Sequence, residues 1–213
     1  MTRCSDCSAE IRPVVAVDID GTLAGYHWQL ERFATAYWDL AIPKSRWNGV
    51  GDFEDHLGMT QLQYREAKLA YRQGGYKRVA PMYDRAFEFM NSLRELGLEI
   101  WITTTRPWSR LDNVDPDTKF WLSRNNIPYD HLLFDDDKYR VLSEIVDDGR
   151  VVAVLDDLPE QYDRAEDELP TAVVLMIERA HNMMNRSGRQ TVSTFDEALL
   201  KIKPTLERWE RYR

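Results

Sequence analysis

The sequence lacks a long apolar run, an N-terminal secretory segment and an excess of positive charge. No hydrophobic stretch approaches the roughly 20 residues of a membrane span, and the first residues do not form an apolar leader. The formal net charge of −8 argues against long, non-specific contact with a nucleic-acid backbone, because such contact needs a basic stripe. We therefore expect a cytoplasmic protein with no membrane partner. A small anionic substrate is compatible with this charge, since a bound cation can invert the field inside an acidic site.

Cysteine is scarce as well, with Cys4 and Cys7 as the two in the chain. Their spacing matches half of a zinc site, but a second cysteine pair is missing and no histidine pair with ligand spacing follows. A zinc ion would need His27, His56 or another subunit to complete its ligands. We favour an N-terminal tail with reduced thiols over a zinc-dependent interaction module.

Short apolar segments rich in β-branched residues alternate with amphipathic helical segments along the 213 residues. Strands are expected at 14–17, 98–103, 131–134, 151–155 and 171–177. Helices are expected near 87–96, 117–125 and 138–146, after Pro159, and at 194–213. This alternation predicts an α/β fold, a Rossmann-like parallel sheet with helices on both faces.

Polar side chains follow three of these expected strands. The strand 14–17 runs into Asp18 and Asp20, the strand 98–103 into 103–107 (Thr-Thr-Thr-Arg-Pro), and the strand 151–155 into Asp156 and Asp157. Lys138 begins a helix after the weak strand 131–134. Because ligands bind beyond the carboxyl ends of parallel strands, we expect these groups to share one pocket.

This combination of groups suits phosphoryl transfer. Clustered carboxylates repel one another, so their joint ionisation needs a cation, for which Mg²⁺ bridging carboxylates and a phosphate is the usual solution. Asp18 could attack phosphorus, and Asp20 could transfer protons to and from the reacting oxygens. Lys138 would neutralise phosphoryl oxygens, and the Thr104 hydroxyl would donate a hydrogen bond. Gly21 permits a sharp turn that brings backbone amides towards the phosphate.

The run Asp18-Ile19-Asp20-Gly21-Thr22-Leu23 resembles the first motif of the haloacid dehalogenase-like (HAD) phosphatases, Asp-x-Asp-Gly-Thr-Leu after an apolar strand. Thr104, Lys138 and the pair Asp156-Asp157 resemble the second, third and fourth motifs, in the family's order. Thr104 is preferred over its threonine neighbours because Thr-x-Arg-Pro is similar to the second-motif ending. The resemblance covers residues 14–177.

The resemblance implies a Mg²⁺-dependent phosphatase with a phosphoaspartyl intermediate on Asp18. In the family, the metal is held by the first aspartate, the backbone carbonyl of the second and an acidic residue of the fourth motif. The resulting assignments are catalytic Asp18, Asp20 and Lys138, substrate-binding Gly21, Thr104, Thr105 and Arg106, and metal-binding Asp18, Asp20, Asp156 and Asp157.

Residues 25–78 form a helical, aromatic-rich insertion that resembles the family's cap lobe. We therefore expect a tail at 1–13, a core at 14–24 and 79–213, and a cap at 25–78. Most cap aromatics should form the cap's own core, with Tyr26, His27 and Trp28 nearest the pocket. The segment 75–82 is similar to the one leading out of the cap in 5'(3')-deoxyribonucleotidases, and the phosphatase domains of polynucleotide kinase/phosphatases share parts of this pattern. A nucleoside monophosphate or a polynucleotide end is the implied substrate.

Each motif also has a structural explanation by itself, such as a turn, a helix cap or a surface lysine. Their joint occurrence at strand ends favours catalysis. Two alternatives keep many of these residues: a phosphotransferase or phosphomutase of the same superfamily, and a non-catalytic nucleotide-binding protein. The sequence does not indicate an oligomeric state.

Overall fold

The computed structural model describes residues 11–212. Cys4 and Cys7 lie outside the described residues, so the zinc interpretation of this pair stays a prediction.

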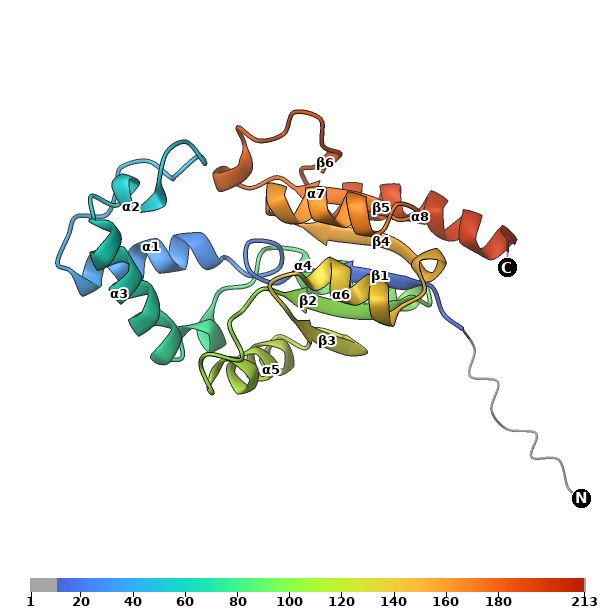
Figure 1. Ribbon diagram of the computed structural model, residues 1–213, viewed down its shortest axis with the longest axis horizontal. Coiled ribbons are helices and arrows are strands. Elements are labelled where there is room, and N and C mark those ends of the chain that lie inside the picture. The colour runs from blue at the N-terminus through green and yellow to red at the C-terminus, as the bar shows by residue number, and fades with distance from the viewer. Residues whose placement is uncertain (1–10, 213) are drawn as a thin grey trace, which may run out of the picture.

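Six parallel strands form one sheet in the order β3-β2-β1-β4-β5-β6 (Figure 1). Their bounds are β1 (Val14–Val17), β2 (Glu99–Thr104), β3 (His131–Phe134), β4 (Val151–Asp156), β5 (Val173–Ile177) and β6 (Thr191–Val192). The predicted parallel α/β fold is confirmed. β6 was not predicted, because two residues are too few to show the alternation that marks a strand.

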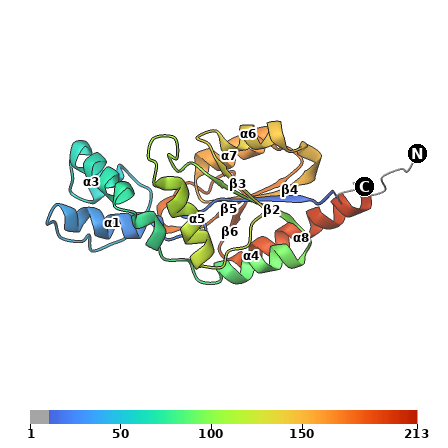
Figure 2. The same ribbon diagram turned by 90° about the horizontal axis from the view of Figure 1, so that it is seen from below.

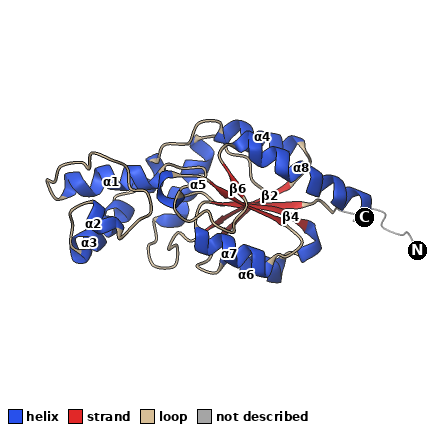
Figure 3. Ribbon diagram, turned by 90° about the horizontal axis from the view of Figure 1, so that it is seen from above, coloured by secondary structure: helices blue, strands red, loops and turns tan. Residues whose placement is uncertain are grey.

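Helices cover both faces of this sheet (Figure 3). On one face lie α4 (Ala86–Glu95), α5 (Val114–Arg124) and α8 (Phe195–Tyr212), and on the other α6 (Lys138–Ile145) and α7 (Pro159–Glu168). The strand β1 is buried on both faces. Val15 and Val17 pack into the hydrophobic cluster shared with α4, α5 and α8, while Val14 and Ala16 pack into the cluster shared with α6 and α7. Side chains alternate between faces along a strand, so a strand buried on both sides needs apolar residues at every position.

The segment between β1 and β2 begins with three helices that lie beyond the end of the sheet (Figures 1 and 2). They are α1 (Tyr26–Tyr37), α2 (Phe53–His56) and α3 (Gln61–Gln73), and the short 3-10 helix η1 (Tyr76–Val79) follows. These helices share a hydrophobic cluster of their own, which contains most of the segment's aromatic side chains, as predicted: Tyr26, Phe33, Trp38, Trp47, Phe53, Tyr64 and Tyr71. We call α1–α3 the cap helices, while the exact domain boundaries stay a prediction.

Two further 3-10 helices lie in connections of the core, η2 (Asp148–Arg150) before β4 and η3 (Ala180–Asn182) after β5. Within residues 11–212, no helix combines the length and the apolar character that a bilayer crossing requires.

Candidate functional site

The predicted site residues meet at one edge of the sheet because β2, β1 and β4 are parallel neighbours. Asp18 directly follows β1, and its backbone N–H donates to the Leu155 carbonyl at 3.0 Å. Val17 and Leu155 are register partners, so the next residue of β4, Asp156, lies beside Asp18. The carboxyl end of β2 lies on the other side of β1.

Lys138 lies between two of these carboxylates. Its ammonium is 2.6 Å from Asp18 Oδ1 and 2.6 Å from Asp156 Oδ2. Tyr139 also donates its hydroxyl to Asp156 Oδ2 at 2.6 Å. Burial disfavours charge on Lys138, but the carboxylates of Asp156 and Asp18 outweigh burial and raise its pKa. Lys138 is therefore an ammonium held in place at the first residue of α6.

Asp157 is fully buried and has a different set of partners. Thr22 donates its hydroxyl to Oδ1 at 3.2 Å, and His181 Nε2 lies 2.6 Å from Oδ2. The Asn182 side chain donates to the Asp157 backbone carbonyl at 2.7 Å. Sequence reasoning missed His181 and Asn182, which lie on η3. The one available signal was that polar residues follow the strand β5 as they follow β1 and β4.

Asp18, Asp156 and Asp157 form a buried group whose carboxylate oxygens lie within 4.8 Å of one another. Burial raises the pKa of Asp18, Lys138 opposes this shift, and the charges of Asp156 and Asp157 add to it. Asp18 and Asp156 share the Lys138 ammonium, while Asp157 lies against His181. A hard cation with oxygen ligands would balance the remaining negative charge. This donor set fits Mg²⁺, and the group can hold a metal ion.

Gly21 has a structural reason to be glycine. Its φ of 94° is one that other residues rarely adopt, and a Cβ here would lie 1.9 Å from Asp157 Oδ2. Glycine therefore lets the Asp157 carboxylate pack directly against the turn after β1. The Gly21 amide donates to the Ala24 carbonyl at 2.8 Å, and its predicted contact with a phosphate stays a prediction.

Asp20 is paired with two buried cations. Arg106 binds both carboxylate oxygens, with Nη2–Oδ1 at 2.7 Å and Nε–Oδ2 at 3.0 Å. Lys77, from η1, also contacts Oδ2, and its ammonium lies 3.5 Å from the centre of the Tyr26 ring. Burial favours the neutral acid, but the charges of Arg106 and Lys77 outweigh it and lower the pKa of Asp20. Asp20 is therefore ionised here.

These contacts change the interpretation of two residues. Arg106 was predicted to bind a substrate phosphate, whereas in this structure its guanidinium is engaged by Asp20. Lys77 was not predicted to have any role. Sequence reasoning could not find it, because one lysine in a short polar segment does not differ from a solvated surface lysine.

The second-motif threonines also differ from expectation. Thr104 is buried, and its hydroxyl accepts from the Arg106 backbone N–H at 3.3 Å. Thr105, one residue beyond the end of β2, lines the cavity at Asp18. Thr105 therefore lies closer to this cavity than Thr104, and the choice between the two hydroxyls as the substrate contact stays a prediction. The strand ends at Thr104, one residue later than predicted, and this shifts which side chain leaves the sheet edge.

A cavity of about 250 Å³ lies over Asp18 and Asp20 between the sheet edge and the cap. We call it the catalytic cavity. As predicted, Tyr26 and His27 line it. Trp28 lines a neighbouring cavity of about 270 Å³ that His27 also borders, which we call the aromatic cavity.

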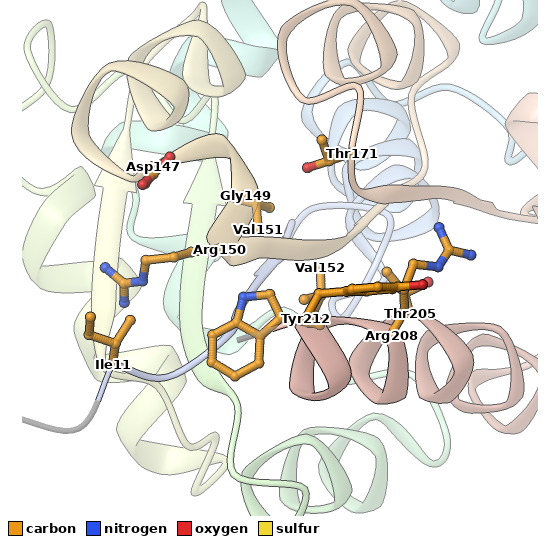
Figure 4. Close-up of a pocket in the computed structure, with 11 residues that line it drawn as sticks. Ile11, Asp147, Gly149, Arg150, Val151, Val152, Thr171, Thr205, Arg208 and Tyr212 are labelled. Carbon is orange, nitrogen blue, oxygen red and sulfur yellow. The ribbon is translucent and has the colours of Figure 1, made fainter.

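A larger cavity of about 520 Å³ lies elsewhere, between the start of β4 and the end of α8 (Figure 4). Its walls include Arg150, Val152, Arg208 and Tyr212. It opens beside the amino end of β4, whereas the acidic group lies at the carboxyl end of that strand, so it takes no part in the site.

No protein-family model matches the sequence, and no curated protein is similar to it in sequence. Solved structures do share its fold. A predicted phosphatase from Clostridium acetobutylicum aligns with a TM-score of 0.62 at 14% identity, over 91% of this chain and 99% of that one. A predicted phosphoglycolate phosphatase from Haemophilus somnus gives 0.60 at 15% identity, over 92% and 99%.

A HAD family hydrolase from Deinococcus radiodurans, with bound phosphate and sodium, aligns with a TM-score of 0.58 at 14% identity, over 91% of this chain and 97% of that one. The chain therefore has the fold of HAD-superfamily hydrolases, as the motif resemblance implied. The finer resemblance to nucleotidases and to polynucleotide kinase/phosphatases stays a prediction.

The pairing of Asp20 with Lys77 and Arg106 predicts a measurable coupling. Asp20→Asn should lower the free energy of unfolding by about 3–5 kcal/mol, because it leaves buried Arg106 and buried Lys77 without their carboxylate. Burial lowers the pKa of Lys77 to about 7 even beside Asp20, so without this carboxylate Lys77 becomes a buried amine with no ion-pair partner. Lys77→Met in the Asp20→Asn background should restore part of the loss, since this buried polar group is removed. Urea denaturation of the two single variants and the double variant gives the coupling energy. Additive effects of the two substitutions would contradict the assigned ion pair.

Proposed function

We propose that this protein is a Mg²⁺-dependent phosphomonoester hydrolase that forms a phosphoaspartyl intermediate on Asp18. The observation that supports this proposal most directly is the position of Asp18 on the wall of the catalytic cavity, with Lys138 and two further carboxylates behind it. A carboxylate at a cavity wall can reach a bound phosphorus atom, and the buried group behind it supplies the charges that phosphoryl transfer needs.

The proposed reaction has two displacements. In the first, an Asp18 carboxylate oxygen bonds to phosphorus, the bond from phosphorus to the leaving oxygen breaks, and Asp20 gives that oxygen a proton. In the second, Asp20 removes a proton from water, the water oxygen bonds to phosphorus, and the bond from phosphorus to Asp18 breaks. Inorganic phosphate leaves, and both carboxyl groups return to their starting protonation states.

The contacts of Asp20 bear on its two proposed roles, as a base and as an acid. A carboxylate paired with Lys77 and Arg106 suits the base that accepts a proton from water. To act as an acid, Asp20 must be protonated, which requires a weaker electrostatic interaction with Lys77 and Arg106. Lys77 lies on η1, directly after the cap helix α3, so a movement of the cap would carry this ammonium with it.

The proposed metal ligands are Asp18, the backbone carbonyl of Asp20, Asp156 and Asp157. Bound Mg²⁺ would polarise the phosphoryl group and neutralise its developing charge. Lys138 orients Asp18 through its 2.6 Å contact and places a positive charge beside the phosphoryl oxygens. Thr105 lines the cavity, and its hydroxyl would donate a hydrogen bond to them.

A nucleoside monophosphate or a polynucleotide end is the substrate that we propose within this class. The aromatic cavity supports it, because Trp28, Trp47 and Phe53 line a space next to His27 at the catalytic cavity. Trp28 is 40% exposed, so its ring is open to a ligand. Stacking of a base on an aromatic side chain is worth about 1–3 kcal/mol.

Asp18→Asn should lower the rate of phosphate release by at least about three orders of magnitude, because the amide cannot act as the nucleophile. Phosphate release in the presence of Mg²⁺ is the measurement. Asp136→Asn is the matched control, since this aspartate is exposed and paired only with exposed Arg110 among the described ion pairs; it should keep the wild-type rate. Full activity of a folded Asp18→Asn protein would contradict the proposal.

A substrate screen tests the metal and the substrate class together. Phosphate release with Mg²⁺ should be fastest for nucleoside monophosphates or phosphorylated oligonucleotides, because sugar phosphates have no base to occupy the aromatic cavity. Excess chelator should abolish it, and added Mg²⁺ should restore it. Activity that survives the chelator contradicts the metal dependence, and faster hydrolysis of sugar phosphates contradicts the nucleotide. Transfer of phosphate to an added alcohol in place of water would identify a phosphotransferase.

A further inference from the structure

Two cations of the cap face the catalytic cavity without a carboxylate partner. Lys68 and Arg72 lie on α3, and both line the cavity that contains Asp18 and Asp20. Within residues 11–212, neither side chain forms an ion pair. The contacts that are present are weaker ones: the Lys68 ammonium lies 5.2 Å from the centre of the Tyr64 ring.

This arrangement is unfavourable for the protein alone. Lys68 and Arg72 are four residues apart on one helix, where like charges repel each other. Burial and the charge of Arg72 lower the pKa of Lys68 to about 8, although Glu54 and Asp20 oppose this shift. The Nε atom of Arg72 is buried and has no hydrogen-bond partner. A buried donor without an acceptor is costly, which indicates that an anionic group is missing from this side of the cavity.

The other cations around the catalytic cavity already have anions. Lys77 and Arg106 contact Asp20, and Lys138 contacts Asp18. A phosphoryl group beside Asp18 would be bound by the charged groups at the sheet edge. Lys68 and Arg72, on the cap side of the same cavity, would still have no anion to bind.

We propose that Lys68 and Arg72 bind a second anionic group of the substrate. The substrate class is then a phosphate monoester that also carries a carboxylate or a second phosphate. Of the two substrates proposed above, a polynucleotide end has such a group, its internucleotide phosphate, and a nucleoside monophosphate does not. This inference rests on the proposed phosphatase function. An arginine matches the geometry of carboxylate and phosphate oxygens, and the neighbouring ammonium adds a point charge.

Two matched substrate pairs test the proposal and separate the two sources of charge. Glycerol 3-phosphate and 3-phosphoglycerate differ by a carboxylate, and thymidine 5'-monophosphate and thymidine 3',5'-bisphosphate differ by a phosphate. The wild-type kcat/KM should be higher for the doubly anionic member of at least one pair, by about tenfold or more, because a charge-assisted hydrogen bond is added. Equal values within both pairs would overturn the proposal.

The same ratio identifies the residues responsible. Lys68→Gln and Arg72→Gln should each lower the ratio within the preferred pair by about tenfold. Arg65→Gln is the matched control on α3, because Arg65 is exposed and does not line the cavity; it should keep the ratio. A fall in kcat/KM by the same factor for both members of each pair would contradict a subsite for a second group.

A binding measurement separates failure of this inference from failure of the proposed function. Calorimetric titration of the Asp18→Asn protein with each member of the two pairs compares affinities without turnover. Tighter binding of a doubly anionic compound, lost with Arg72→Gln, supports the subsite even if the wild-type protein hydrolyses none of the four. Equal affinities within both pairs overturn the subsite whatever the hydrolysis results are.

Discussion

The structure depends on the burial of three neighbouring carboxylates, two of which share one ammonium. Asp18, Asp156 and Asp157 cannot all be ionised away from water unless positive charge accompanies them, and Lys138 supplies part of it. Parallel pairing of β1 with β4 imposes this crowding, because it aligns the residues that follow each strand. Gly21 permits it, since any side chain there would overlap Asp157. The remaining charge imbalance is what makes a divalent cation the natural partner of this group.

The two aspartates of the first motif occupy opposite electrostatic environments. Asp18 lies among other carboxylates, and burial raises its pKa, while Asp20 lies between two cations that lower its pKa. The two side chains have different partners although they are close in the chain. Asp18 contacts Lys138 of α6, whereas Asp20 contacts Lys77 of η1 and Arg106. Different environments for two carboxyl groups are how a single site obtains groups with different roles in proton transfer and attack.

Much of this could be predicted from the sequence, because the strands are short apolar runs and each motif directly follows one. The parallel sheet, its two helical layers and the separate aromatic cluster of the cap were all predictable from periodicity and residue type. The contacts of Lys77, Arg106 and His181 were not, since each joins segments far apart in the chain and leaves no local pattern. The choice between Thr104 and Thr105 depended on where β2 ends, and strand ends are set by pairing with neighbours.

In the proposed function, the sheet edge and the cap would bind different parts of the substrate. The sheet edge would hold the phosphoryl group, while the cap contributes aromatic rings and the cations Lys68 and Arg72 to the cavity walls. Covalent attachment of phosphate to Asp18 is the step on which the proposed reaction depends. The most direct measurement is acid quenching of the protein during turnover, borohydride reduction of the acyl phosphate, and peptide mass spectrometry. The reduced residue should be found at position 18 alone. Phosphate release with no modified Asp18, or with modification at another residue, would rule out the proposed intermediate.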